Sequence, residues 1–79
     1  MSKKPSLENA VKEAVAIYFK NLDGEAPTRI YDMVIDSVEK TLLQDILDRA
    51  DGNQSAAANM LGINRNTLRA KMKKYRLLT

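Results

Sequence analysis

Apolar residues recur at intervals of three and four along most of this chain, which is the spacing that places them on one face of an α-helix. The first such series begins at Leu7 and ends at Leu22. Ser6 precedes it and can cap the first turn, and Asp23-Gly24 follows it as a stop signal, because glycine tolerates a left-handed backbone. We therefore expect the first helix at about 6–22.

A second, longer series begins at Ile30 and continues without a breaker to Asp51-Gly52. Because Pro27 suits a first helical turn, where its missing N–H forms no bond, we expect this helix at about 27–50. Its band of apolar positions is too wide for one short neighbouring helix to cover. A chain of 79 residues is also near the size at which a single core gives only marginal stability. A second copy of the chain is therefore the partner that we expect.

Two shorter apolar series follow, joined by a tight turn. Gln54–Leu61 is predicted as an alanine-rich helix, Gly62-Ile63-Asn64 as the turn, and Arg65 to about Lys74 as the last helix, capped by Asn64. Two short helices joined by a three-residue turn that contains glycine describe a helix-turn-helix, here at about 54–73. An ordinary helical hairpin is the alternative.

The spacing between Ala58, Gly62 and Leu68 favours the helix-turn-helix over the hairpin. Ala58 precedes Gly62 by four positions, and Leu68 follows it by six. A small side chain at Ala58 lets the two helices cross closely, Gly62 tolerates the positive φ of the turn, and Leu68 fills the space between the helices.

The whole pattern predicts an all-α chain of four helices, because no segment has the alternation of a strand. We expect a short flexible N-terminus at 1–5, dimerisation helices at 6–51 and a helix-turn-helix segment at 52–79.

Composition then removes several classes of function. The chain is 44% apolar and 29% charged, as in a folded domain, and it has no Cys, His or Trp. Disulfides, Cys/His metal sites and His-based catalysis are thereby excluded, and no nucleophile–base pair is apparent, so we expect neither an enzyme nor a cofactor nor a bound metal. The longest apolar run, Ala14 to Phe19, is six residues long, so no membrane segment is expected.

Charge is distributed unevenly. Residues 1–51 hold seven basic and all ten acidic side chains, a net charge of −3, whereas residues 52–79 hold six basic side chains and no acidic one, a net charge of +6. A folded segment of this kind is typical of a surface that binds a polyanion. A solvated basic tail is the alternative, but apolar residues interleave with the charges at helical spacing.

The last helix carries the candidate DNA contacts. Leu68, Met72 and Tyr75 share one face and are expected in the core, while the N-terminal end of such a helix meets base edges in the major groove. Asn64 and Arg65 have suitable chemistry, an amide for adenine or phosphate and a guanidinium for guanine. The candidates are the polar and basic residues Asn64, Arg65, Asn66, Thr67, Arg69, Lys71, Lys73 and Lys74. The four basic ones after Thr67 are expected at phosphates.

Three polar residues open the preceding helix: Asn53, Gln54 and Ser55. Their backbone N–H groups and side chains could hold a phosphate at the positive end of the helix dipole. Simple capping explains them equally well, and both interpretations stay open.

At these residues the chain closely resembles the factor-for-inversion-stimulation (Fis) family of bacterial nucleoid proteins. The resemblance spans about residues 5–78 and is carried by three runs: Tyr31-Asp32-x-Val34, Gly52-Asn53-Gln54-Ser55-x-Ala57-Ala58 and Gly62-Ile63-Asn64-Arg65-Asn66-Thr67-Leu68-Arg69. It implies an intertwined homodimer built on the first two helices, with the helix-turn-helix presented by the last two. It also implies a cytoplasmic, nucleoid-associated protein that bends double-stranded DNA and regulates transcription and chromosome organisation.

The chain departs from the family in three places. Thr41 stands where a proline is frequent, and Ala70 where a basic residue is usual, so one phosphate contact is expected to be missing. Longer members carry an N-terminal arm that touches a site-specific recombinase, and only five residues precede the first predicted helix here. Contact with a recombinase or with RNA polymerase therefore stays open.

Two other functions fit parts of the pattern. Similar helix-turn-helix segments end large bacterial enhancer-binding activators, although there they follow other domains. A helical adaptor that binds protein instead of DNA is the second alternative, and it predicts no preference of the basic segment for polyanions.

Overall fold

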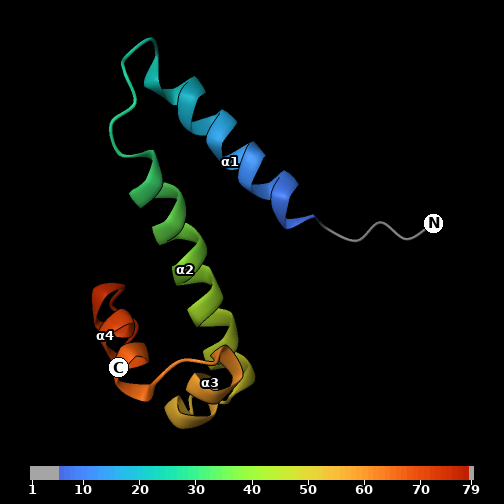
Figure 1. Cartoon of the computed structure of the whole chain (residues 1–79), viewed down its shortest axis with the longest axis vertical. Helices are drawn as coiled ribbons and strands as arrows, with labels where there is room; N and C mark the ends of the chain where they lie inside the picture. Colours follow the sequence, from blue (N-terminus) through green and yellow to red (C-terminus); the bar gives the residue numbers. More distant parts are fainter. Residues whose placement is uncertain (1–5, 79) are drawn as a thin grey trace, which may run out of the picture. The chain divides into compact units, whose positions relative to one another are not determined.

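The computed structural model describes residues 6–78. The predicted flexible N-terminus at 1–5 and Thr79 lie outside the described residues. The described part of the chain forms four α-helices and no strand, which confirms the all-α prediction (Figure 1). The helices are α1 (Leu7–Leu22), α2 (Ile30–Arg49), α3 (Gln54–Leu61) and α4 (Arg65–Lys74).

The predicted bounds are confirmed for α1, α3 and α4, whose ends carry local signals. At the start of α1 the Ser6 hydroxyl accepts a hydrogen bond from the backbone N–H of Asn9 at 3.2 Å. At its end Asp23 takes the left-handed conformation with φ of 54°. One short side chain and one residue in a rare conformation thus define the helix.

The predicted start of α2 at Pro27 is wrong, because the helix begins at Ile30. Pro27 permits a first helical turn but does not fix one, and Ala26 before it has no side-chain oxygen to act as a cap. Arg29 has none either, so charge favours the observed start more than a cap does. In the structure the Arg29 carbonyl accepts the first helical bond, from Met33, and the Arg29 side chain pairs with Asp32 at 2.9 Å. Asp32 also places a negative charge in the first turn, where the helix dipole favours it.

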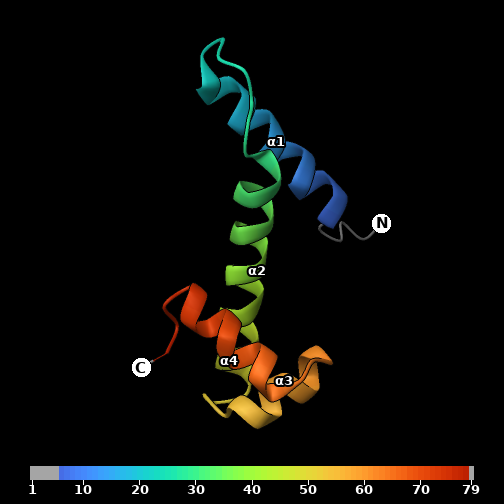
Figure 2. The same ribbon diagram turned by 60° about the vertical axis from the view of Figure 1, so that its left-hand side comes forward.

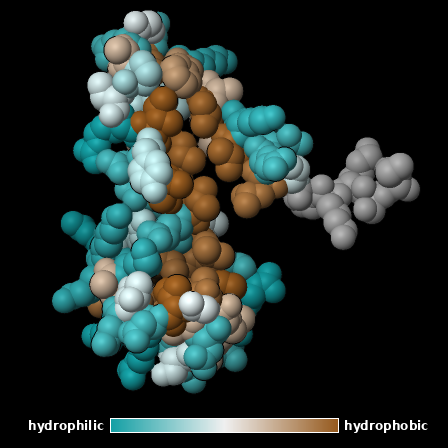
Figure 3. Space-filling model, in the orientation of Figure 1, coloured by the Kyte–Doolittle hydropathy of each residue, from teal (hydrophilic) through white to brown (hydrophobic). Residues whose placement is uncertain are grey.

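The chain divides into two compact units, and α2 contributes to both. The first unit runs to Ser37 and contains α1 and the beginning of α2. None of its described residues is buried. It leaves six large hydrophobic side chains exposed, by 39% to 76%: Leu7, Ile17, Phe19, Tyr31, Met33 and Ile35. Figure 3 shows hydrophobic side chains at the surface along both helices.

The second unit, from Val38 on, holds the hydrophobic core. Five buried residues form it, from α2, α3 and α4: Leu43, Ala57, Ala58, Leu68 and Met72. Partly buried apolar residues surround them, among them Ile46, Leu47 and the C-terminal Leu77 and Leu78. Both ribbon views show α4 beside the C-terminal half of α2 (Figures 1 and 2). The helix-turn-helix therefore packs on the end of α2, which holds it in place.

Candidate nucleic-acid interface

The turn between α3 and α4 has the geometry that its sequence predicts. Gly62 ends α3 with φ of 75°, and the N–H of Ile63 donates to the Ala58 carbonyl at 3.0 Å. No atom lies within 4 Å of the position that a Cβ at Gly62 would occupy. Glycine is therefore favoured here by its left-handed backbone and not by a close neighbour.

The packing between α3 and α4 confirms the roles predicted for Ala58 and Leu68. Ala58 is 3% exposed and Leu68 is completely buried. Met72 lies one turn after Leu68 in the same core, and Tyr75 packs against it half-buried, as predicted for this face. The opposite face of α4 is thereby turned to solvent.

The N-terminal end of α4 presents three exposed polar side chains, Arg65, Asn66 and Thr67. Asn64 caps this end, because its Oδ1 accepts from the backbone N–H of Asn66 at 2.7 Å. One lone pair of Asn64 Oδ1 is thus used by the cap, which leaves less of the hydrogen-bonding capacity of Asn64 for a base. The exposed guanidinium of Arg65 becomes the strongest candidate for a base edge.

The exposed face of α4 is basic, as the sequence predicts. Arg69, Lys73 and Lys74 are exposed, and so is Ala70, which interrupts the row of charges. The Lys74 ammonium lies 5.2 Å from the centre of the Tyr75 ring, so a cation–π contact holds it near the surface. Lys73 and Lys74 stand in the last turn, where the negative end of the helix dipole favours cations.

The three residues predicted at the start of α3 are used in different ways. Asn53 is the N-cap, with its Oδ1 accepting from the N–H of Ala56 at 3.0 Å. Gln54 is half-buried, and its Oε1 accepts from Arg69 Nη1 at 3.3 Å. Ser55 is exposed. Capping is thus shown for Asn53, while phosphate binding at this end stays a prediction. The Gln54–Arg69 bond joins the two candidate groups across the motif.

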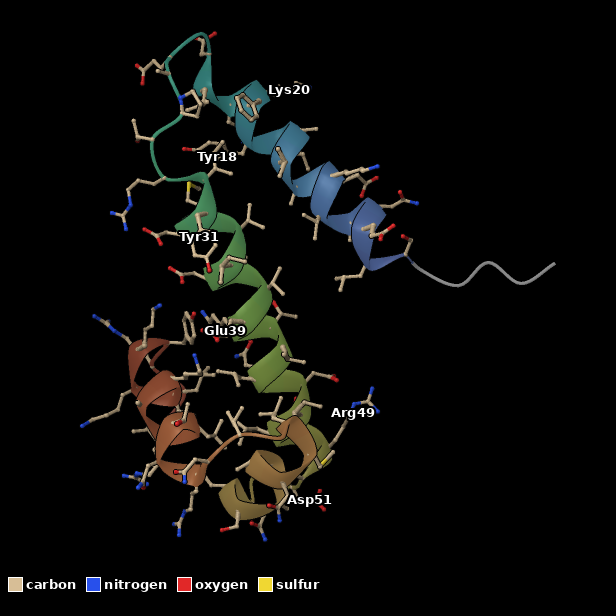
Figure 4. The ribbon with its side chains drawn as sticks, in the orientation of Figure 1. Tyr18, Lys20, Tyr31, Glu39, Arg49 and Asp51 are labelled. Carbon is tan, nitrogen blue, oxygen red and sulfur yellow. The ribbon has the colours of Figure 1, made fainter. Side chains whose placement is uncertain are left out.

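Lys71 has a different environment from the other basic residues. Its side chain is 34% exposed, and its Nζ donates to Glu39 Oε2 at 2.8 Å. The other oxygen of the same carboxylate accepts from the Tyr75 hydroxyl at 2.5 Å. In Figure 4 the Glu39 side chain extends from α2 toward α4. The hydrogen bond from Lys71, followed by that from Tyr75, lowers the pKa of Glu39 below its usual 4.5.

Sequence reasoning did not identify Glu39 as a member of this site. Its local signal is weak: it precedes the buried Leu43 by four positions, so it lies on the side of α2 that faces the core. Its partners come 32 and 36 residues later. No spacing rule within a helix reaches so far, so only the packing of α4 on α2 reveals the contact.

Two other features, a cluster of metal ligands and a membrane-spanning helix, are not found in the part of the chain that the structure describes. Residues 6–78 contain no group of three or more acidic side chains placed to hold a metal ion. In the same part of the chain no helix has both the length and the apolar character needed to cross a membrane.

Comparison with known proteins points to one family. Residues 34–75, which cover the end of α2, α3 and α4, match the family described as "Bacterial regulatory protein, Fis family". A Fis-like DNA-binding protein of Ralstonia nicotianae is 45% identical over 78 residues, which is 99% of this chain and the whole of that protein. The DNA-binding protein Fis of Glaesserella parasuis is 50% identical over 72 residues, 91% of this chain and 72% of that protein.

Proposed function

Because the chain belongs to the Fis family of bacterial regulatory proteins, we propose that it is a homodimer that binds and bends double-stranded DNA. As a protein of the cytoplasmic nucleoid, it would regulate transcription and chromosome organisation. The observation that carries this proposal is the helix-turn-helix, whose last helix exposes Arg65, Asn66 and Thr67 at its start. That helix lies in a segment with no acidic residue. The major groove of DNA admits such a helix and is flanked by the phosphates that its charges suit.

In this proposal the contacts divide into two groups. Arg65, with Asn66 and Thr67 beside it, meets base edges at the N-terminal end of α4. Arg69, Lys73 and Lys74 meet phosphates along its exposed face, which sets the register of the protein on the duplex without reading sequence. Gln54, the first residue of α3, accepts a hydrogen bond from Arg69, so the start of α3 lies beside this phosphate-binding face. In this proposal the backbone N–H groups at that start bind a further phosphate.

Dimerisation is supported by the apolar surface that one copy leaves uncovered. The exposed hydrophobic residues of the first unit continue along α2 into Val38 and Leu42, which are 40% and 48% exposed. Exposed apolar area of this extent marks an interaction surface. A second copy supplies a matching apolar face. It also supplies a second recognition helix, so that the dimer has the two that a two-fold site requires.

Bending is supported by how few side chains of this chain can read bases. One lone pair of Asn64 Oδ1 already serves the cap, so Arg65, Asn66 and Thr67 are the main candidates. The resemblance to the family implies that the two recognition helices of the dimer lie closer together than successive major grooves of straight DNA. Filling both grooves then requires a bend and a narrowed minor groove, at a cost of about 1–6 kcal/mol that depends on the sequence deformed. Shape would thus supply the specificity that base contacts lack.

A mobility shift of a defined duplex across a salt series tests the proposal. A dimer would present twelve basic residues from its two helix-turn-helix segments. If about 8 of them neutralise phosphates, the slope of log affinity against log salt should be about −7. A slope near zero would instead support the protein-binding adaptor and reject DNA as the partner.

A further inference from the structure

The six basic residues of the last third are not equivalent, because Lys71 is held by a carboxylate and Lys73 is exposed. The Lys71 ammonium and the Tyr75 hydroxyl bind the two oxygens of Glu39, at 2.8 Å and 2.5 Å. Lys71 lies in the last turn of α4 and Tyr75 is the C-cap residue four positions later, while Glu39 belongs to α2. One carboxylate therefore ties two successive turns of the candidate recognition helix to the helix on which it packs.

We propose that Lys71 is a positioning residue and not a phosphate contact, and that Glu39 holds it away from DNA while seating α4 on α2. This inference rests on the proposed DNA binding. It replaces a uniform row of phosphate contacts with two kinds of lysine on the same helix: Lys71, bonded to α2, and Lys73, exposed to the ligand.

The burial of the pair supports this division. The side chains of Lys71 and Glu39 are 34% and 24% exposed, whereas the members of the Arg29–Asp32 and Arg49–Asp45 pairs are 53% to 73% exposed. Exposed pairs on a protein surface contribute little, because water and salt screen them. A more enclosed pair is screened less. Moving Lys71 to a phosphate would also deprive the half-buried Glu39 carboxylate of its charge-assisted hydrogen bond, which costs free energy.

The geometry also explains how Glu39 affects binding without touching DNA. Two bonds to adjacent turns restrain the rotation of α4 about its own axis, and that rotation decides which way Arg65 and Arg69 point. Glu39 also places one negative charge next to a basic surface. Its removal should therefore strengthen binding to all sequences while it weakens the distinction between them.

Salt dependence separates the two classes of lysine. On a defined duplex, Lys73→Ala should flatten the log–log slope by about 2 per dimer, because two phosphate contacts are lost. Lys71→Met, which keeps most of the apolar stem, should leave the slope within about 0.5 of the wild-type value, because no counterion is released by a lysine that does not reach phosphate. Equal flattening by both variants would overturn the proposal.

Glu39→Gln supplies the complementary test. Its amide oxygen can still accept from Tyr75, but the ion pair is lost and Lys71 is released toward the ligand. We expect the slope to steepen by about 2 per dimer and the affinity ratio between a cognate and a scrambled duplex to fall. A merely structural ion pair would not steepen the slope, so a wild-type slope in Glu39→Gln would overturn the role assigned to Glu39.

Two controls keep the outcomes distinct. Each variant is melted alone, and slopes are measured at a temperature where it is folded, so that a folding defect is not mistaken for lost contacts. The double variant Glu39→Gln/Lys71→Met should return the slope to the wild-type value, because the released charge is then absent. Failure of DNA binding itself would appear differently, as a slope near zero in the wild type and no response to Lys73→Ala.

Discussion

The two units of this chain use the same kind of amphipathic helix with opposite results. The first unit buries none of its described residues and exposes six large hydrophobic ones, whereas the second buries five residues around Leu43 and Leu68. Three short segments from α2, α3 and α4 meet in the second unit, so each covers the apolar stripe of another. The first unit has no third element, and its apolar faces remain available to a partner.

A similar contrast exists inside the second unit, at two neighbouring residues of α2. Leu43 is 2% exposed and packs against the helix-turn-helix, while Leu42 is 48% exposed. Successive residues of a helix point about 100° apart, so one helix can serve a core on one side and an interface on another. In the proposed dimer, the core of the second unit would position the recognition helix, and the exposed apolar residues, Leu42 among them, would serve association.

The largest effect is expected from a charge placed on the uncovered face of α2. Leu42→Asp should destabilise the protein by more than about 4 kcal/mol, because an unpaired carboxylate would be buried in the dimer. Circular dichroism and sedimentation should show an unfolded chain. Met60→Asp, at a residue that is 53% exposed on α3, is the control and should cost under about 0.5 kcal/mol. A folded Leu42→Asp monomer would refute the dimer core.

The core of the second unit gives the next effect. Leu68→Ala should cost about 2–5 kcal/mol, because a completely buried side chain is removed from between two helices. Leu7 is 71% exposed in a single copy of the chain, so Leu7→Ala should reduce the stability of that copy far less than Leu68→Ala does. Chemical denaturation checks both. A large cost at Leu7 that grows as the protein is diluted would show that the dimer covers α1 as well.

DNA itself can test the division between reading bases and reading shape. With constant flanks, A/T-rich base pairs at the dimer axis should bind at least about twofold tighter than G/C-rich ones, because bending narrows the minor groove there. Arg65→Ala should reduce discrimination at the flanking bases and leave the central preference intact. Titrations of both duplexes, with bending followed by gel mobility of permuted fragments, measure this. An unchanged affinity after the central exchange would reject shape readout.

The smallest expected effect concerns acid. The charged groups that face Glu39 are Lys71 and, more weakly, Lys74, with the Tyr75 hydroxyl beside them, and together they lower the pKa of Glu39. The folded-state pKa therefore lies below the unfolded value of about 4.5. Its contribution to stability should be complete above that pH and decline as the pH falls through the folded pKa. Urea denaturation of the wild type and Glu39→Gln should converge at acidic pH. A constant difference would contradict the assignment.

Local sequence signals predict most of the helix boundaries in this fold. Ser6, Asn53 and Asn64 cap the next turn of their own helices, and Gly62 ends α3, so α1, α3 and α4 are predictable within one or two residues. The start of α2 was predicted too early, because Pro27 permits a first helical turn without fixing it, whereas Asp32 stabilises the turn that begins at Ile30.

The sequence by itself therefore determined the features that depend on residues within about four positions of each other. These are the helix ends, the amphipathic faces and the basic character of the last third. The tertiary structure alone decided which polar groups meet across the fold. Gln54 bonds Arg69, and Glu39 bonds Lys71 and Tyr75, over separations of 15 to 36 residues. The physical reason is that a carboxylate bonds whatever donor the packing brings within about 3 Å, and that packing depends on the whole core. Lys71 and Lys73 are both lysines of the last helix, and the bond between Lys71 and Glu39 is what the tertiary packing adds.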